Sequence, residues 1–258
     1  MGLVESGLVD IIFTTDVKFA VETLFDSNHP GRMFALFRHP IRRLVSKFYY
    51  VQHATWERSY DPKLKSMTLL QWAHTQNDHN FYLQKLSGKK WYELKERDLR
   101  EAMRTLKRRF VVGLTDQMRE SVHRFNTVMG IDDTSPDRDV DCMDEFFDGK
   151  EEKRMNAHEH PDVSMLKCSF SISSFVHFAE SVFHSQIEEG SPEWNALYAK
   201  NEYDIKLYEY VVELFAEQRD IINDFTRQHM LLLDKKVTKL IKRVERANRK
   251  GGGNRKSG

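Results

Sequence analysis

The residues best suited to chemistry in this sequence lie between Arg38 and Ser46, in the segment Arg-His-Pro-Ile-Arg-Arg-Leu-Val-Ser. An arginine side chain can bind a phosphate through paired hydrogen bonds, and a serine hydroxyl can donate another. Arg42 and Ser46 are four positions apart, a spacing that puts both on one face of a helix. The N–H groups at the start of such a helix also favour an anion. The segment therefore predicts a phosphate site, and an arginine-rich surface helix is the alternative interpretation.

The flanking sequence predicts the elements that hold this segment. Residues 32–37 form an apolar run of strand length. Pro40 suits the first turn of the helix that follows, because its missing N–H would be unpaired there anyway. A second short strand is expected over residues 109–113. Arg38 would then leave the sheet at its carboxyl edge, where open α/β folds bind ligands.

The rest of the chain alternates between short strands and helices, which predicts an α/β fold with a parallel sheet. Residues 9–13 are expected to form a short buried strand, and residues 67–108 three helices separated near Asn77 and Gly88. A strongly helical C-terminal stretch is expected from Trp194. Its apolar stripe would comprise Ile205, Tyr208, Val212, Phe215, Ile222 and Phe225.

The charge distribution divides the chain into a domain over residues 1–234 and a tail over residues 235–258. The tail holds ten Lys or Arg residues and one acid, whereas residues 131–162 hold twelve acids and four bases and are expected to be an acidic insertion. A basic helix in the tail could bind anionic lipid, nucleic acid or an acidic glycan. A solvated helix that frays towards its glycines is the alternative.

The segment from Arg38 to Ser46 resembles the 3′-phosphate-binding motif of carbohydrate sulfotransferases, an Arg-x-Pro-x-x-Arg-(Leu/Phe)-x-Ser pattern on a P-loop-like, three-layer α/β fold. Three later segments are similar to further motifs of that family and follow in the expected order. They are residues 80–88 (Asn … Leu-x-Gly), residues 112–121 (acidic-x-x-x-Glu-Ser) and residues 201–208 (Asn-x-x-Asp-x-x-Leu-Tyr). The resemblance covers roughly residues 9–228.

This resemblance implies transfer of a sulfuryl group from the co-substrate 3′-phosphoadenosine-5′-phosphosulfate to a hydroxyl, with a glycan as the acceptor. Arg38 and Ser46 would bind the 3′-phosphate. In related enzymes a His or Glu on an early helix removes the proton from the acceptor hydroxyl. The matching region here offers Asp16 and Glu22. Asp16 is the candidate catalytic residue, although its place at the start of a helix also suits a capping residue.

The family also uses a 5′-phosphosulfate loop, a Gly-rich turn with a Lys or Arg that stabilises charge as the sulfuryl group leaves. No such loop precedes residue 9, and residues 87–90, Ser-Gly-Lys-Lys, are interpreted as a turn. We therefore expect an N-terminally incomplete fold whose sheet lacks a central strand and exposes apolar flanks. It would come from a truncated gene model, or from a degenerate relative that binds a nucleotide or a polyanion without catalysis.

Other signals are weaker. Residues 137–141 imitate a calcium loop but Cys142 stands where glycine is required, so no metal site is expected. No specific nucleic-acid partner is indicated, and Cys142 and Cys168 fit one disulfide or two thiols. No apolar run is long enough to span a membrane. The resemblance implies a Golgi membrane or lumenal location, with membrane attachment only through an N-terminal anchor missing from this sequence.

Overall fold

The centre of the molecule is a sheet of two parallel strands, β1 (Met33–Phe37) and β2 (Phe110–Leu114), in a computed structural model that describes residues 12–24, 31–129, 187–220 and 222. The strands pair in register from Met33 beside Phe110 to Phe37 beside Leu114. The described chain is otherwise mainly helical. A helix-rich α/β fold with a parallel sheet is thereby confirmed.

The helices follow the order expected from the sequence, including three between residues 67 and 109. The elements are α1 (Val17–Thr23), α2 (Pro40–Val51), η1 (Pro62–Ser66), α3 (Leu69–Thr75), α4 (Phe81–Ser87), η2 (Trp91–Glu93), α5 (Glu96–Arg109), η3 (Thr115–Gln117), α6 (Met118–Met129) and α10 (Pro192–Tyr198). Residues 202–220 form a further helix, here named helix 202–220.

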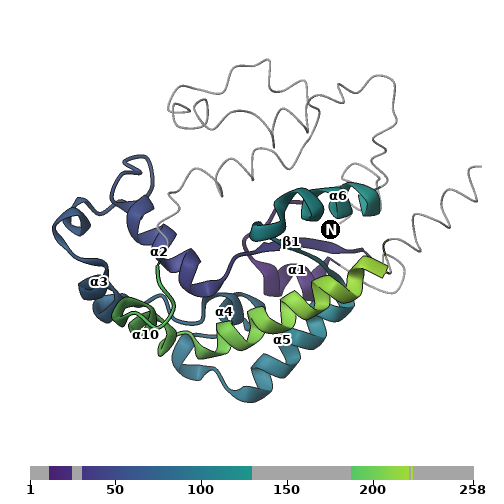
Figure 1. The fold of residues 1–258 in the computed structure, drawn as a ribbon. Coiled ribbons are helices and arrows are strands. Elements are labelled where there is room, and N and C mark those ends of the chain that lie inside the picture. Colours follow the sequence, from purple (N-terminus) through teal and green to yellow (C-terminus); the bar gives the residue numbers. More distant parts are fainter. Residues whose placement is uncertain (1–11, 25–30, 130–186, 221, 223–258) are drawn as a thin grey trace, which may run out of the picture.

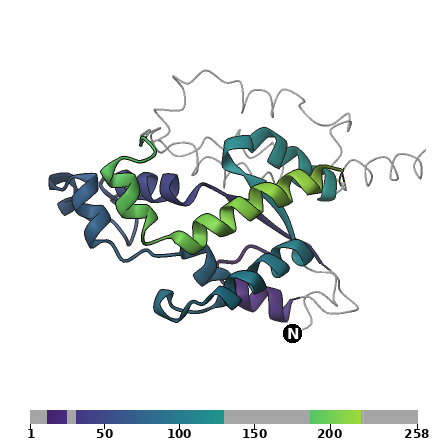
Figure 2. The ribbon, with the colours of Figure 1, turned by 60° about the horizontal axis from the view of Figure 1, so that its bottom comes forward.

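Helices cover both faces of the sheet, and helix 202–220 runs between α6 and α5 in both views (Figures 1 and 2). This helix also closes the outer edge of β2. The Gln218 side chain accepts a hydrogen bond from the Val112 N–H at 3.0 Å and donates one to the Phe110 carbonyl at 2.7 Å. The outer edge of β1 pairs with no other strand in the described ranges, and four of its five residues are half-buried.

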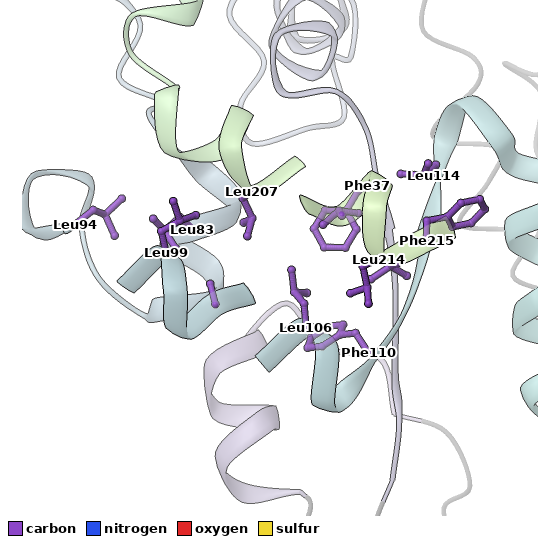
Figure 3. Close-up of a cluster of buried hydrophobic side chains, with 13 residues drawn as sticks. Phe37, Leu83, Leu94, Leu99, Leu106, Phe110, Leu114, Leu207, Leu214 and Phe215 are labelled. Atoms are coloured by element: carbon purple, nitrogen blue, oxygen red, sulfur yellow. The ribbon is translucent and has the colours of Figure 1, made fainter. Parts of the chain in front are cut away.

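The main core lies between the sheet and the helices α4, α5 and 202–220 (Figure 3). Leu207 and Leu214 pack there with Leu106 and Phe110. On the opposite face of the sheet, α6 contributes Phe125 to a smaller cluster. Gly113 lies at this contact, where an added Cβ would come within 2.8 Å of side-chain atoms of Leu36, Ser121 and Phe125. Only glycine therefore lets α6 approach β2 this closely.

A second core joins α2, α3 and α10 at the other end of the molecule (Figure 1). Ile41, Leu44 and Phe48 of α2 are almost completely buried in it. Their spacing leaves the remaining face of α2 for polar side chains.

Local sequence explains several helix ends. Pro40 occupies the first position of α2, and the Thr68 and Gln71 side chains form a capping box at the start of α3. Gly88 ends α4 in the left-handed conformation, with φ of 70°. The interpretation of residues 87–90 as a turn is thereby confirmed.

Two sequence predictions are wrong. Ile12 and Phe13 were expected in a buried strand but are 45% and 71% exposed and lie outside any strand. The predicted C-terminal stripe is wrong at Val212, which is 39% exposed, and it omits the buried Leu207 and Val211. Three other predicted members, Ile205, Phe215 and Ile222, are buried as expected, and Phe225 lies outside the described residues.

Several predictions fall outside the described residues: the strand at residues 9–11, the acidic insertion at 131–162, the domain boundary at 234 with the basic tail, residues 137–141, and the pairing of Cys142 with Cys168. Among the described helices, none is long and apolar enough to cross a membrane. The described ranges also contain no cluster of three or more metal-binding side chains.

Candidate functional site

The candidate site lies at the carboxyl edge of the sheet, where β1 and β2 end side by side. Because Phe37 pairs with Leu114, the next residues, Arg38 and Thr115, leave the sheet together. Arg38 leads into the N-terminus of α2, which begins at Pro40. The segment from Arg38 to Ser46 thus lies at the ligand-binding edge of a parallel sheet, as the sequence predicts.

Arg38 is half-buried, yet its guanidinium makes no hydrogen bond or ion pair with any described residue. Burial lowers the pKa of Arg38, while the nearby Asp116 carboxylate opposes that shift. The group stays charged, since arginine is not deprotonated in proteins. A half-buried cation without a partner is costly, and an anionic ligand would supply the missing hydrogen bonds.

The backbone of Arg38 is held by Tyr82 of α4. The Tyr82 hydroxyl accepts a hydrogen bond from the Arg38 N–H at 3.1 Å and donates one to the Arg38 carbonyl at 2.9 Å. Its ring lies 5.2 Å from that of Phe37, the last residue of β1. Tyr82 therefore fixes the point from which the Arg38 side chain departs.

Ser46 and Arg42 differ in burial although they lie one turn apart on α2. Arg42 is exposed and its guanidinium approaches the Asp116 carboxylate at 3.4 Å, whereas Ser46 is buried. The Ser46 hydroxyl has no hydrogen-bond partner among the described residues. The predicted polar face of α2 is therefore exposed at Arg42 and buried at Ser46. The Ser46 hydroxyl lies at the boundary of the core without a described hydrogen-bond partner.

An aromatic cluster lies beside this segment. The His39 ring stacks on Trp194 of α10 at 5.1 Å and meets the edge of the Tyr208 ring at 5.2 Å. Burial, and then the charge of Arg42, lower the pKa of His39, and its Nδ1 is buried without a partner among the described residues. His39 is therefore a packed imidazole that is neutral at neutral pH.

Two further polar groups near the ends of these elements have no hydrogen-bond partner in the described part of the chain. Burial raises the pKa of Tyr208 to about 12, so its hydroxyl stays protonated, and no described residue bonds to it. The Thr115 hydroxyl oxygen is buried, and no described residue bonds to it either. We name Arg38, Ser46, Thr115 and Tyr208, with His39, Arg42 and Asp116, the carboxyl-edge site.

Asp16, the predicted catalytic residue, acts here as a helix cap. Its carboxylate accepts a hydrogen bond from the Phe19 N–H at 3.2 Å at the start of α1, and it is exposed. No interaction connects Asp16 with the carboxyl-edge site in the described structure. A role as general base stays a prediction that this geometry does not support.

Two of the segments that carry the family resemblance contact each other. The Asp204 carboxylate accepts hydrogen bonds from the Tyr82 and Leu83 N–H groups, both at 2.9 Å, and so caps α4. In return, the Asn80 side-chain oxygen accepts the Asp204 N–H at 3.1 Å, and the Asn201 side-chain oxygen accepts the Asn80 N–H at 2.8 Å. The starts of α4 and helix 202–220 therefore cap each other.

The third segment also has a structural role. The Ser121 hydroxyl accepts the Leu114 N–H at 2.8 Å and lies 3.0 Å from the Leu114 carbonyl, so it closes the end of β2. Glu120 binds Arg124, which is 1% exposed and stacks on the Phe215 ring at 3.7 Å. Of the four segments that carry the resemblance, the one from Arg38 to Ser46 presents both a cation and a hydroxyl that no described residue bonds.

Sequence reasoning missed the contributions of Thr115, Asp116 and Tyr208 to the site. Thr115 and Asp116 could have been found, because they directly follow a predicted parallel strand and must share its carboxyl edge. The position of Tyr208 depends on the mutual caps of two distant helices, for which the sequence holds no local signal.

The arrangement can bind a phosphate-sized anion. Arg38 supplies a cation, and the hydroxyls of Ser46, Thr115 and Tyr208 are available as donors. The carboxylate of Asp116, in contrast, disfavours a second negative charge beside β2. The chain matches no protein-family model, no curated protein and no solved structure. Its functional interpretation therefore rests on these residues and on the resemblance of its motifs.

Proposed function

We propose that this chain belongs to the sulfotransferase class, binds the 3′-phosphate of 3′-phosphoadenosine-5′-phosphosulfate through Arg38 and Ser46, and serves sulfuryl transfer to a carbohydrate hydroxyl. The observation that carries the proposal is the half-buried Arg38 guanidinium without a partner among the described residues. A cation in that position is suited to an anion, and the free Ser46 hydroxyl adds a donor.

The residues fit the 3′-phosphate end of the co-substrate. Arg38 would bind two phosphate oxygens and Ser46 a third, while Tyr82 holds the Arg38 backbone in place. The phosphosulfate end has less support, because β2 brings the Asp116 carboxylate to the same edge. When bound, the co-substrate supplies the sulfuryl group, and the role of these residues is to bind and orient its nucleotide.

The weaker support for the phosphosulfate end favours a second candidate function, which is nucleotide binding without transfer. Both cations of the carboxyl-edge site, Arg38 and Arg42, come from one segment, and Arg42 is already near Asp116. A protein that keeps only the 3′-phosphate contacts would bind the desulfated nucleotide without accelerating transfer. Under the first function we further propose a glycan acceptor and a Golgi location, both of which rest on the resemblance.

Calorimetric titration with 3′-phosphoadenosine-5′-phosphate tests the binding step. We expect saturable binding that adenosine 5′-monophosphate does not reproduce, and that Arg38→Ala weakens by about 10- to 100-fold, because charge-assisted hydrogen bonds are lost. Arg104→Ala is the matched control, since Arg104 is an exposed arginine of α5 whose ion pair in the described ranges is with Glu101. Equal affinities for the two nucleotides, or for the two variants, would exclude a 3′-phosphate site.

Sulfuryl transfer is tested separately with co-substrate that carries a radioactive label in its sulfuryl group. The chain is incubated with the labelled co-substrate and a panel of oligosaccharides, and the products are separated from unreacted nucleotide. Arg38-dependent incorporation supports the enzyme, whereas Arg38-dependent binding without incorporation supports the nucleotide-binding protein.

A further inference from the structure

Asp116 places a carboxylate at the carboxyl edge of the sheet, next to the arginines that surround the start of α2. It lies in η3, two positions after the last residue of β2, and the pairing of Phe37 with Leu114 brings it beside the segment that follows β1. Its Oδ2 lies 3.4 Å from Nη1 of Arg42. A ligand that approaches Arg38 therefore also meets this carboxylate.

The charge of Asp116 acts on several groups of the carboxyl-edge site. Burial lowers the pKa of Arg38 and of His39 and raises that of Tyr208. The Asp116 carboxylate raises the pKa of each of these three groups, whereas the Arg42 guanidinium lowers it. Asp116 and Arg42 thus oppose each other within one electrostatic environment, which includes the cation that we expect to bind the ligand.

The ion pair between Arg42 and Asp116 can open at little cost. The two side chains are 58% and 49% exposed, and the described structure gives neither of them another hydrogen bond or ion pair. Ion pairs exposed to this degree contribute little to stability, because water solvates the separated charges nearly as well. A ligand with enough negative charge can therefore draw the Arg42 guanidinium away from Asp116.

The balance of these charges favours a ligand with one negative charge. Among Arg38, Arg42 and Asp116 the excess is one positive charge. A phosphate monoester carries about two negative charges above neutral pH and a phosphate diester about one. The second charge of the monoester is repelled by Asp116 unless Arg42 turns to the ligand, so the carboxylate penalises the dianion more than the monoanion.

We propose that Asp116 is a specificity-determining residue of the carboxyl-edge site, which holds Arg42 away from the ligand and so lowers the affinity for dianions more than that for monoanions. Asp116 does not itself bind the ligand. A dianion recruits Arg42 only by opening its pair with Asp116. The inference rests on the proposed function in one respect, that the site takes an anion through Arg38.

Adenosine 3′-monophosphate and its methyl ester are the two probes, because they differ by one negative charge at the same phosphate. Both are titrated by calorimetry at about pH 8, where the monoester is doubly ionised, and at low ionic strength. We expect Asp116→Asn to tighten binding of the monoester by about 10-fold and of the methyl ester by about threefold, since electrostatic repulsion grows with the charge of the ligand.

An Arg42→Ala background tests whether Asp116 acts by holding Arg42. There the same Asp116→Asn change should tighten binding of the monoester by only about threefold, because no guanidinium is released to the ligand. Glu101→Gln is the matched control, since Glu101 is an exposed carboxylate of α5 whose described ion pair, at 3.1 Å, is also with an arginine, Arg104. It should leave both affinities unchanged.

The outcomes separate this inference from the proposed function. Equal gains for the two probes, no gain in Asp116→Asn, or an undiminished gain in the Arg42→Ala background would overturn the inference, while Arg38-dependent binding would leave the proposed function standing. Arg38-dependent binding by Asp116→Asn, with none by the unchanged protein, would support the inference and overturn the proposed function. No Arg38-dependent binding by either folded protein would overturn both.

Discussion

The hydroxyl of Tyr82 exchanges two hydrogen bonds with the backbone of Arg38, accepting from its N–H and donating to its carbonyl. Burial raises the pKa of Tyr82 to about 12, so the hydroxyl keeps the proton that this exchange needs. Arg38 is thereby anchored through its backbone, while its side chain is left free for a ligand.

Replacing Tyr82 by phenylalanine removes both hydrogen bonds but keeps the ring. We expect Tyr82→Phe to lower the free energy of unfolding by about 1–3 kcal/mol, because the Arg38 N–H and carbonyl lose their partner. Denaturant unfolding measures this change, and Tyr210→Phe is the control, since the Tyr210 hydroxyl makes no hydrogen bond with a described residue. The variant should also bind 3′-phosphoadenosine-5′-phosphate more weakly. An unchanged affinity would mean that Tyr82 does not position Arg38.

Ser46→Ala tests the second predicted phosphate contact. The Ser46 hydroxyl has no described partner, so its removal should leave stability nearly unchanged. Loss of one hydrogen bond to a charged phosphate should weaken nucleotide binding by about 10-fold, less than Arg38→Ala. Calorimetry measures the affinity and thermal unfolding measures the stability. A destabilised variant with unchanged affinity would assign Ser46 to the core instead.

Asp204 should make stability depend on pH. Burial raises the pKa of Asp204 to about 6, although its hydrogen bonds from Leu83 and Tyr82 oppose that shift. The folded state therefore holds a proton that the unfolded state releases near pH 4. The contribution of Asp204 to stability is greatest below that pH and falls as the pH rises through about 6, by up to roughly 3 kcal/mol.

Asp204→Asn removes the titrating carboxyl group. It also removes one of the two hydrogen bonds that the Asp204 side chain accepts from α4. Urea unfolding of both proteins between about pH 4 and pH 7 measures their free energies of unfolding. The value for the unchanged protein should fall relative to that for Asp204→Asn as the pH rises. A difference that stays constant over this range would contradict the raised pKa.

The ion pair between the buried Arg124 and the partly exposed Glu120 predicts coupling between the two side chains. Glu120→Ala leaves the Arg124 guanidinium without its carboxylate partner at 2.8 Å, in a position that is almost fully buried. We expect this variant to cost about 1–3 kcal/mol of stability. Arg124→Met keeps an apolar stem against Phe215, and adding Glu120→Ala to it should cost little more. Additive losses in the double variant would show that the two side chains are not coupled.

The local part of the carboxyl-edge site could be predicted from the sequence. The apolar run before Arg38, Pro40 after it, and the apolar spacing along α2 each act over a few residues, and together they place Arg38 where β1 ends. The parallel pairing with β2 follows from the same alternation of strands and helices.

The environment of those residues could not be predicted. His39 is packed because Trp194 and Tyr208, distant in the sequence, arrive beside it. Ser46 is buried although Arg42, on the same side of α2, is exposed. Helical spacing indicates which residues share a face, but the neighbouring elements decide how much of that face is covered.

The mutual caps of α4 and helix 202–220 have a consequence for how the chain folds. Backbone N–H groups at the start of each helix donate hydrogen bonds to a side chain at the start of the other, and the bond between Asn80 and Asn201 joins positions 121 residues apart. The two helices should therefore form in one cooperative step, late in folding, because distant contacts are entropically slow to close. A chain cut between the two helices should give two fragments that are each unfolded alone and fold when they are mixed. Such a pair would serve as a split protein whose reassembly depends on the mutual caps.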